Sequence, residues 1–189
     1  NLIKKNGTII TDNAIPELKR IKKIAKKKKL NLITIFSKNS DLELVSHKFK
    51  NESQILKIKH KNTFFSLKLN LIGKIQVKNI FMAILAAEKS DLNMKSIIKI
   101  IDKIKPVEGR LEKIGNIKNN SKVILDYAHT PDALKTVLLN IKEQFPSTKI
   151  SLVFGCGGDR DKEKRSKMGK IADQFADYIY LTDDNPRNE

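Results

Sequence analysis

Three polar clusters each follow a short apolar run, and they hold most of the side chains in this chain that could do chemistry. The clusters span residues 126–132 (D-Y-A-H-T-P-D), 155–161 (G-C-G-G-D-R-D) and 183–187 (D-D-N-P-R). In an open parallel α/β sheet, ligands bind beside the carboxyl ends of the strands. We therefore predict that these clusters follow buried strands of such a sheet and lie at its ligand-binding edge.

The cluster at 155–161 combines three glycines with charged side chains. Glycine allows a tight turn and a close approach of the backbone to a ligand. Because the spacing matches neither common phosphate-binding glycine pattern, a plain turn between a strand and a helix remains the alternative. The crowding of Asp159, Arg160 and Asp161 favours a site for a charged ligand.

The cluster at 126–132 offers a carboxylate and an imidazole. Asp126 could accept hydrogen bonds from ribose hydroxyls, and His129 could donate to a phosphate or stack on a base. A single histidine is more often structural, and no spacing of residues here indicates a metal site.

The cluster at 183–187 contains two carboxylates followed by Arg187. Aspartate, asparagine and proline all favour β-turns, so a turn without a ligand is one interpretation. The alternative is a site for a zwitterion, in which the carboxylates hold an ammonium group and the guanidinium holds a carboxylate.

The formal net charge of +17 suggests a nucleic-acid partner, but the type of charge argues against it. Only five of the 38 basic residues are Arg, the side chain that reads phosphates and guanines bidentately. Abundant Lys, Asn and Ile indicate an A/T-rich coding bias. Against that bias, four arginines lie in clusters that contain glycine or proline, which points to recognition of carboxylate or phosphate: Arg110, Arg160, Arg165 and Arg187.

Composition narrows the class of protein further. The single cysteine, Cys156, excludes a disulfide framework and fits a reducing cytoplasm. No stretch is apolar enough to span a membrane, and no signal peptide is visible. Since the chain begins at Asn1 and stops directly after a motif, we expect an internal fragment of a longer protein.

Hydrophobic periodicity divides the chain near residues 105–108. Before this point we expect two strands around a helix capped by Asp12 or Asn13, then an antiparallel meander, then two helices. These elements cover residues 7–12, 14–29, 32–36, 41–49, 53–59, 63–69, 77–87 and 94–104. After it, strands alternate with helices, which implies a parallel sheet with right-handed crossovers. The predicted elements there are 122–126, 131–144, 149–154, 164–176 and 178–182.

Four motifs occur in a fixed order: V-E-G-R-L-E (107–112), D-Y-A-H-T-P-D, G-C-G-G-D-R-D-K-E-K-R (155–165) and D-D-N-P-R. With G-K-I-Q-V-K-N-I-F-M-A-I-L-A-A (73–87), they resemble the Mur ligases, ATP-dependent amide-bond ligases of peptidoglycan precursor synthesis. The resemblance implies an α/β fold. Residues 1–106 would be the end of the family's central ATPase domain, and residues 107–189 the start of its Rossmann-like C-terminal domain.

The resemblance also implies a reaction. Family members use ATP and Mg2+ to form an acyl phosphate on a nucleotide-linked peptide, which the amine of an amino acid then attacks. By resemblance, Asn79, Arg110, Asp126 and His129 would bind ATP. The phosphate loop and the metal ligands would lie outside this chain, so we expect no complete catalytic apparatus within it.

The amino acid would be bound by Arg160 and the turn Asp184, Asn185, Pro186 and Arg187. This turn resembles that of relatives that add meso-diaminopimelate to UDP-N-acetylmuramoyl-L-Ala-D-Glu, in which the Arg would pair with the distal carboxylate. Ligases that add lysine, another amino acid or glutamate to a folate or cyanophycin-type acceptor remain alternatives. A basic nucleic-acid-binding module is the alternative of another class, and it is supported by the net charge alone.

Three positions depart from the family's pattern. Gln76 stands where Asn is usual, which puts contacts on the adenine side in doubt. Glu108 and Ser166 each stand where Pro is usual, and both are compatible with small backbone adjustments.

Overall fold

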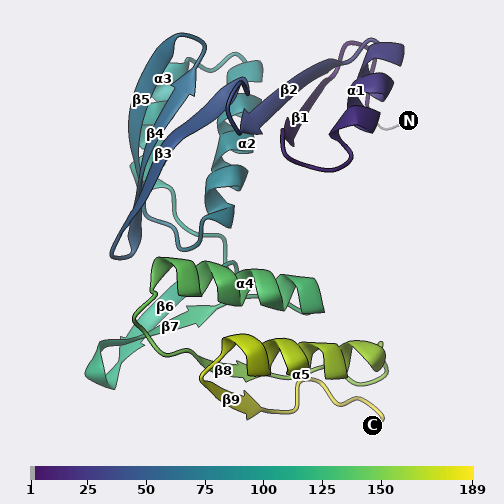
Figure 1. Ribbon diagram of the computed structural model, residues 1–189, viewed down its shortest axis with the longest axis vertical. Coiled ribbons are helices and arrows are strands. Elements are labelled where there is room, and N and C mark those ends of the chain that lie inside the picture. The colour runs from purple at the N-terminus through teal and green to yellow at the C-terminus, as the bar shows by residue number, and fades with distance from the viewer. Residues whose placement is uncertain (1–2) are drawn as a thin grey trace. The chain divides into compact units, whose positions relative to one another are not determined.

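The computed structural model describes residues 3–189 and divides the chain into two compact units, Asn1–Lys105 and Pro106–Glu189 (Figure 1). Each unit has its own hydrophobic core. No helix within the described residues is both long and apolar enough to cross a membrane.

The first unit is built on a five-stranded sheet in the order β1-β2-β3-β4-β5. The first two strands, β1 and β2, run parallel, and β2 also pairs in parallel with the start of β3. The next two pairings are antiparallel, which confirms the predicted meander. The strands are Thr8–Asp12, Asn31–Phe36, Leu42–Lys50, Ser53–His60 and Thr63–Leu69.

The helix α1 (Leu18–Lys27) begins later than the sequence suggests. Its N-cap is Glu17, which makes no capping hydrogen bond through its side chain, so the predicted cap at Asp12 or Asn13 is wrong. The carboxylate of Asp12 instead accepts hydrogen bonds from the backbone N–H of Ala14 and from Lys78. Lys78, which is 66 residues away in the sequence, therefore binds the carboxylate that was expected to cap the helix.

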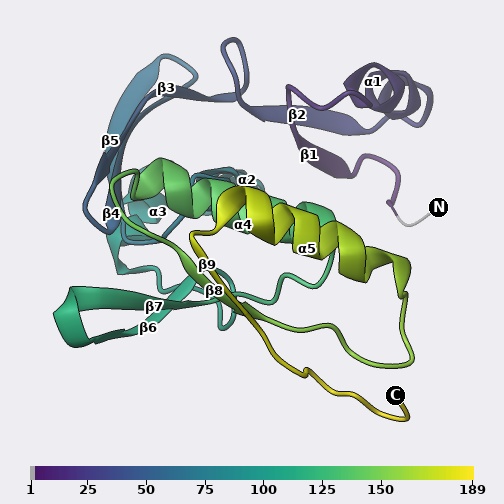
Figure 2. The ribbon, with the colours of Figure 1, turned by 60° about the horizontal axis from the view of Figure 1, so that its bottom comes forward.

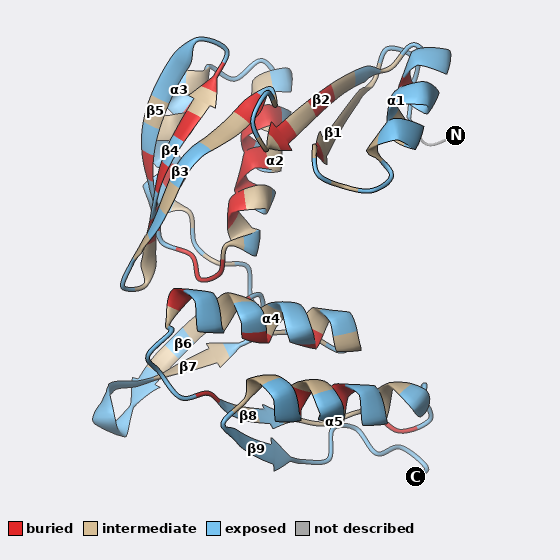
Figure 3. Cartoon of the chain, viewed as in Figure 1, coloured by how far each residue is buried: buried red, intermediate tan, exposed pale blue. Residues whose placement is uncertain are grey.

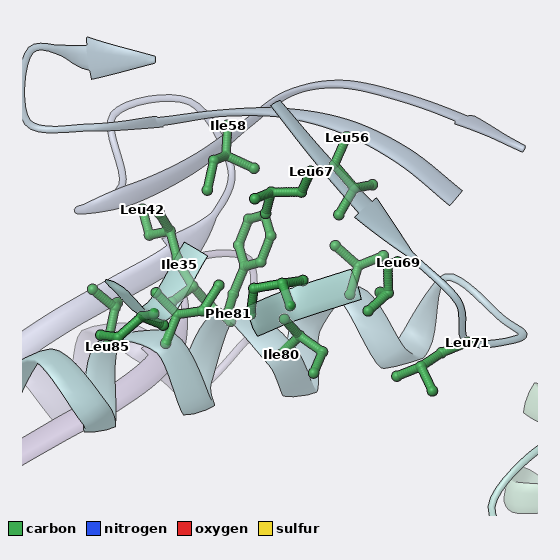
Figure 4. Close-up of a cluster of buried hydrophobic side chains, with 14 of the residues drawn as sticks. Ile35, Leu42, Leu56, Ile58, Leu67, Leu69, Leu71, Ile80, Phe81 and Leu85 are labelled. Atoms are coloured by element: carbon green, nitrogen blue, oxygen red, sulfur yellow. The ribbon is translucent and has the colours of Figure 1, made fainter. Parts of the chain in front are cut away.

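The helix α2 (Ile75–Lys89) supplies the centre of the first core (Figure 4). Its buried residues recur at intervals of three and four, so that they share one helix face. Phe81, fully buried, lies among Ile35, Leu67 and Leu85 in this core. The predicted helix 94–104 is divided into α3 (Met94–Ile100) and a single 3-10 turn, Ile101–Lys103.

The second unit contains two separate strand pairs. The parallel pair β8 (Ser151–Phe154) and β9 (Tyr178–Leu181) confirms the predicted parallel sheet. The strand β7 (Ser121–Leu125) instead forms an antiparallel hairpin with β6 (Glu112–Ile117), an element that the sequence reading missed. Within the described residues, β7 is therefore not hydrogen-bonded into the parallel pair.

Two helices, α4 (Pro131–Gln144) and α5 (Glu163–Phe175), lie side by side in this unit (Figure 2). They enclose a core of Leu134, Leu138, Ile150 and Met168, against which the apolar side of β8 packs. By contrast, β9 is exposed along its whole length (Figure 3).

Candidate functional site

Two of the predicted clusters are packed directly against each other in the second unit. The backbone N–H of Gly158 donates to the carbonyl oxygen of Asn185 at 2.7 Å. A Cβ on Gly158 would lie 1.8 Å from the carbonyl oxygen of Pro186, and one on Gly155 would lie 2.3 Å from that of Thr182. Both positions therefore require glycine, because any side chain would force the two segments apart.

The third glycine of this loop lies among the predicted amino-acid-binding residues. A Cβ on Gly157 would lie 3.6 Å from a carboxylate oxygen of Asp184, 3.7 Å from the carbonyl oxygen of Asn185 and 4.0 Å from Cγ of Arg160. The structure thus brings Arg160, Asp184 and Asn185 together around one small residue. Arg160 and Asp184 are both exposed, so a ligand can reach both charged side chains.

A network of charges fixes the same loop to the last residues of the chain. The carboxylate of Glu189 pairs with Arg165 and, at 3.2 Å, with Lys162, and it accepts the backbone N–H of Asp159 at 3.1 Å. The hydrogen bond from Arg165 is the main cause that lowers the pKa of Glu189 to about 2. Asn188 adds a hydrogen bond to the Asp159 carboxylate at 2.8 Å.

The cluster at 126–132 is joined to the 107–112 motif. The two carboxylate oxygens of Asp126 accept the backbone N–H groups of Leu111 at 2.8 Å and Ala128 at 2.9 Å. The backbone N–H of Tyr127 donates to the carbonyl oxygen of Gly109 at 2.8 Å. Asp126 therefore holds both motifs in place as well as offering a carboxylate at the end of β7.

The 126–132 cluster also contains two rings, those of Tyr127 and His129, beside the guanidinium group of Arg110. The Arg110 guanidinium lies 5.1 Å from the centre of the Tyr127 ring, which is itself 5.2 Å from the His129 ring. Lys164, at the start of α5, donates to the carbonyl oxygen of His129 at 3.1 Å. The structure thus brings together Arg110, Asp126 and His129, three of the four residues predicted to bind ATP.

The fourth, Asn79, belongs to the first unit. It is exposed in the second turn of α2, and its side-chain amide donates to the side-chain oxygen of Gln76 at 3.1 Å. Gln76, which departs from the family's pattern, is thereby in direct contact with the predicted nucleotide-binding residue.

The first unit contains a hydrogen-bonded pair, His60 and Glu88, that sequence analysis did not predict. His60, which is 7% exposed, donates from Nδ1 to the carbonyl oxygen of Asp41 and contacts Glu88 through Nε2 at 3.0 Å. Burial raises the pKa of Glu88, but hydrogen bonds from His60 and Lys61, together with their charge, bring this pKa below its ordinary value. These groups line a cavity of about 250 Å3. Residues 28 apart in sequence carry no spacing signal, so only the fold reveals the pair.

Comparison with known proteins places these features in a family. Residues 109–189 match the family described as Mur ligase, glutamate ligase domain. The chain is 35% identical, over 97% of its length, to the UDP-N-acetylmuramoyl-L-alanyl-D-glutamate–2,6-diaminopimelate ligase of Rickettsia felis. The chain belongs to the Mur ligase family. The UDP-N-acetylmuramoyl-L-alanyl-D-glutamate–2,6-diaminopimelate ligase 2 of Clostridium acetobutylicum is 40% identical over 80% of this Mur ligase chain.

Solved structures agree with this assignment. A UDP-N-acetylmuramoyl-L-alanyl-D-glutamate–2,6-diaminopimelate ligase superposes with a TM-score of 0.66 and 27% identity, covering 97% of this chain and 38% of that one. A folylpolyglutamate synthetase complex shares the fold with a TM-score of 0.76 at 21% identity, covering 96% of this chain and 44% of its own. The chain spans about a third of the length of the curated relatives, 34% of the Rickettsia felis protein and 31% of the Clostridium acetobutylicum protein.

Proposed function

We propose that this chain is part of an ATP-dependent ligase that joins meso-diaminopimelate to UDP-N-acetylmuramoyl-L-Ala-D-Glu in the cytoplasm. The observation that carries the proposal is the packing of the 155–161 loop on the 182–187 turn, which assembles Arg160, Asp184 and Asn185 around Gly157. Relatives named for this reaction match over almost the whole chain. In this proposal residues 1–106 complete a central ATP-binding domain, and residues 107–189 begin the C-terminal domain.

The nucleotide would be bound by Asn79, Arg110, Asp126 and His129. These side chains suit the role: a guanidinium matches phosphate oxygens bidentately, and a carboxylate accepts from ribose hydroxyls. The stack of Arg110 on Tyr127 limits the guanidinium's freedom, which reduces the entropy lost on binding.

Divalent metal would be held elsewhere in the full-length protein. Across residues 3–189, no three His, Cys, Asp or Glu side chains group as a metal site. In the full enzyme Mg2+ would neutralise charge on the transferring phosphoryl group. The part that we assign to this chain is to position ATP and to hold the attacking amine, after an acyl phosphate has formed on the dipeptide carboxylate.

The amino-acid site has the charges that a zwitterion requires. Asp184 would hold the ammonium group, and Arg160 would hold the α-carboxylate. Arg187 would pair with the distal carboxylate, a group that meso-diaminopimelate has and lysine lacks. Pairing of this carboxylate with Arg187 would distinguish the two substrates, because lysine would leave the guanidinium without its anion.

The test is ligation by the full-length protein, followed as ADP release with the nucleotide dipeptide and either meso-diaminopimelate or L-lysine. We expect activity with meso-diaminopimelate, and Arg187→Ala should raise its KM by roughly 10- to 100-fold. Arg20→Ala, which removes the same charge from exposed α1, is the control and should leave KM unchanged. Equal turnover of L-lysine would refute the specificity, and no ADP with either amino acid would refute the ligase.

A further inference from the structure

A strained turn ends the second strand of the first unit. Phe36 has a φ of +83°, and the backbone N–H of Ser37 donates to the carbonyl oxygen of Ile35 at 3.1 Å. These features define a γ-turn of the rare form with positive φ, which is costly for a residue with a bulky side chain. Strain of this kind persists only where the surrounding structure compensates, and it is concentrated at functional sites.

The compensation comes from a cluster around the Phe36 ring. The ring packs against Phe81 of the core, with centroids 6.1 Å apart. Nζ of Lys78 lies 4.9 Å from the centre of the same ring and donates to the Asp12 carboxylate at 2.5 Å. Asp12 is 6% exposed, and its other oxygen accepts the backbone N–H of Ala14 at 2.9 Å.

The buried carboxylate of Asp12 is paired with the ammonium group of Lys78. An ionised carboxylate that is almost fully removed from water requires a cation or several donors nearby. Lys78 is the cation that Asp12 contacts, and two-thirds of its side chain is buried. The pair therefore joins the end of β1 to α2 with a specific geometry.

The cluster lies at the edge of the sheet where ligands are expected. Asp12 is opposite Ile35 in the parallel register of β1 and β2, so Asp12 and Phe36 mark the carboxyl ends of two adjacent parallel strands. Lys78 is in the first turns of α2 and directly precedes Asn79. The three side chains thus fix the part of α2 that presents Asn79.

We propose that Lys78 is a positioning residue of the nucleotide site, which acts through Asp12 and Phe36 to hold Asn79 in place for ATP. This inference rests on the proposed function, and it adds Asp12, Phe36 and Lys78, three residues to which the family resemblance assigned no role. Lys78 itself makes its contacts with the protein, so its removal should change how ATP is bound rather than the chemistry that follows.

The experiment compares variants of the full-length protein by calorimetric binding of a non-hydrolysable ATP analogue and by steady-state ligation. Lys78→Met keeps the aliphatic contact with Phe36 and removes the ammonium. We expect the analogue's Kd and the KM for ATP to rise about tenfold, with kcat at saturating ATP and the KM for the amino acid changed by less than about twofold. Lys78→Arg should restore most of the affinity, because a guanidinium can also pair with Asp12 and stack on the ring.

Two further variants separate positioning from stability. Lys89→Met removes the same charge from the exposed end of α2 and should leave ATP binding unchanged. Lys78→Met alone leaves the buried carboxylate of Asp12 without its cation. The double variant Asp12→Asn/Lys78→Met removes that charge as well, so its melting temperature should return toward that of the unmodified protein while its ATP affinity stays low.

The outcomes are distinct. Unchanged ATP affinity in Lys78→Met, or recovery of affinity in the double variant, would overturn the positioning role. Weaker binding of all substrates in parallel with a lower melting temperature would overturn it as well, since this describes loss of the fold. Analogue binding by the unmodified protein without any ligation would contradict the proposed ligase and leave the Lys78 comparison valid. Absence of analogue binding would overturn both.

Discussion

Replacement of Gly158 by alanine tests whether the packing of the two clusters builds the amino-acid site. The new Cβ would meet the carbonyl oxygen of Pro186 at 1.8 Å and its carbonyl carbon at 2.6 Å. Since carbon contacts are comfortable at about 3.5 Å, the two segments must separate by roughly 1.5 Å. This movement also breaks the hydrogen bond from Gly158 to Asn185.

Typical free-energy costs are known for a lost hydrogen bond and for overpacking. A broken hydrogen bond costs about 1 kcal/mol, and forced overpacking costs about 1–3 kcal/mol. We therefore expect Gly158→Ala to lower the free energy of unfolding of the second unit by about 2–4 kcal/mol. A displacement of this size at Arg160 and Asp184 should lower kcat/KM for the amino acid by roughly 100-fold, while the KM for ATP changes little.

The assays are urea unfolding followed by circular dichroism and steady-state ligation by the full-length protein. Gly169→Ala is the matched control, because its Cβ would have no atom within 4 Å and it lies within helix α5. That variant should keep full activity and be slightly more stable, since alanine favours a helix. Near-normal stability and kcat/KM in Gly158→Ala would show that the loop adapts freely, and the steric argument would be wrong.

Three further outcomes are expected from single residues. Glu88→Gln removes the carboxylate that contacts His60. The stability that depends on this carboxylate is present above its unfolded pKa of 4.5 and is lost as pH falls through the lower folded pKa. The difference between the urea midpoints at pH 7 and pH 3.5 should therefore be smaller in the variant. Arg165→Ala should return the pKa of Glu189 from about 2 toward 4.5, as measured by carboxyl carbon NMR. Phe81→Ala should lower the free energy of unfolding of the first unit by about 3–5 kcal/mol, which would be measured as loss of the cooperative unfolding transition of that unit.

Each of these has a control and a contradicting result. Glu17→Gln, at an N-cap without a side-chain hydrogen bond, should retain the native pH dependence, and an identical response in Glu88→Gln would disprove the role of the pair. A Glu189 pKa that stays near 2 without Arg165 would exclude that arginine as the cause. Phe64→Ala, at a 54% exposed site, should lower the free energy of unfolding only slightly. Equal losses of this free energy in Phe64→Ala and Phe81→Ala would contradict the place of Phe81 in the core.

Local signals in the sequence were sufficient for some elements and failed for others. The helix α4 was predicted to the residue because Thr130 caps it and Pro131 occupies its first position, both of which are encoded locally. The strand β6 was missed because E-K-I-G-N-I has weak β-propensity, and its extended form depends on pairing with β7. The start of α1 was wrong because Asp12 bonds to Lys78, a contact between residues 66 apart.

In the candidate site, too, the sequence predicted the features that are encoded locally and did not predict the contacts between distant segments. Residue types and spacing identified the clusters that contain Asp126 and Arg160, because charged side chains after apolar runs are visible in any sequence. They did not reveal which clusters touch, since the contact of Gly158 with Pro186 depends on the parallel pairing of β8 and β9. The assigned binding roles stay predictions until the variants are measured.

The separation of Asp12 from Lys78 also bears on the order in which the first unit folds. The meander β3–β4–β5 closes short loops and can form early, whereas β1 and β2 must wait for α2 before the buried carboxylate meets its ammonium across 66 residues. We expect substitutions in the meander to slow folding, and Lys78→Met mainly to accelerate unfolding. The edge that we assign to ATP would then be the last part of this unit to become structured and the first to open.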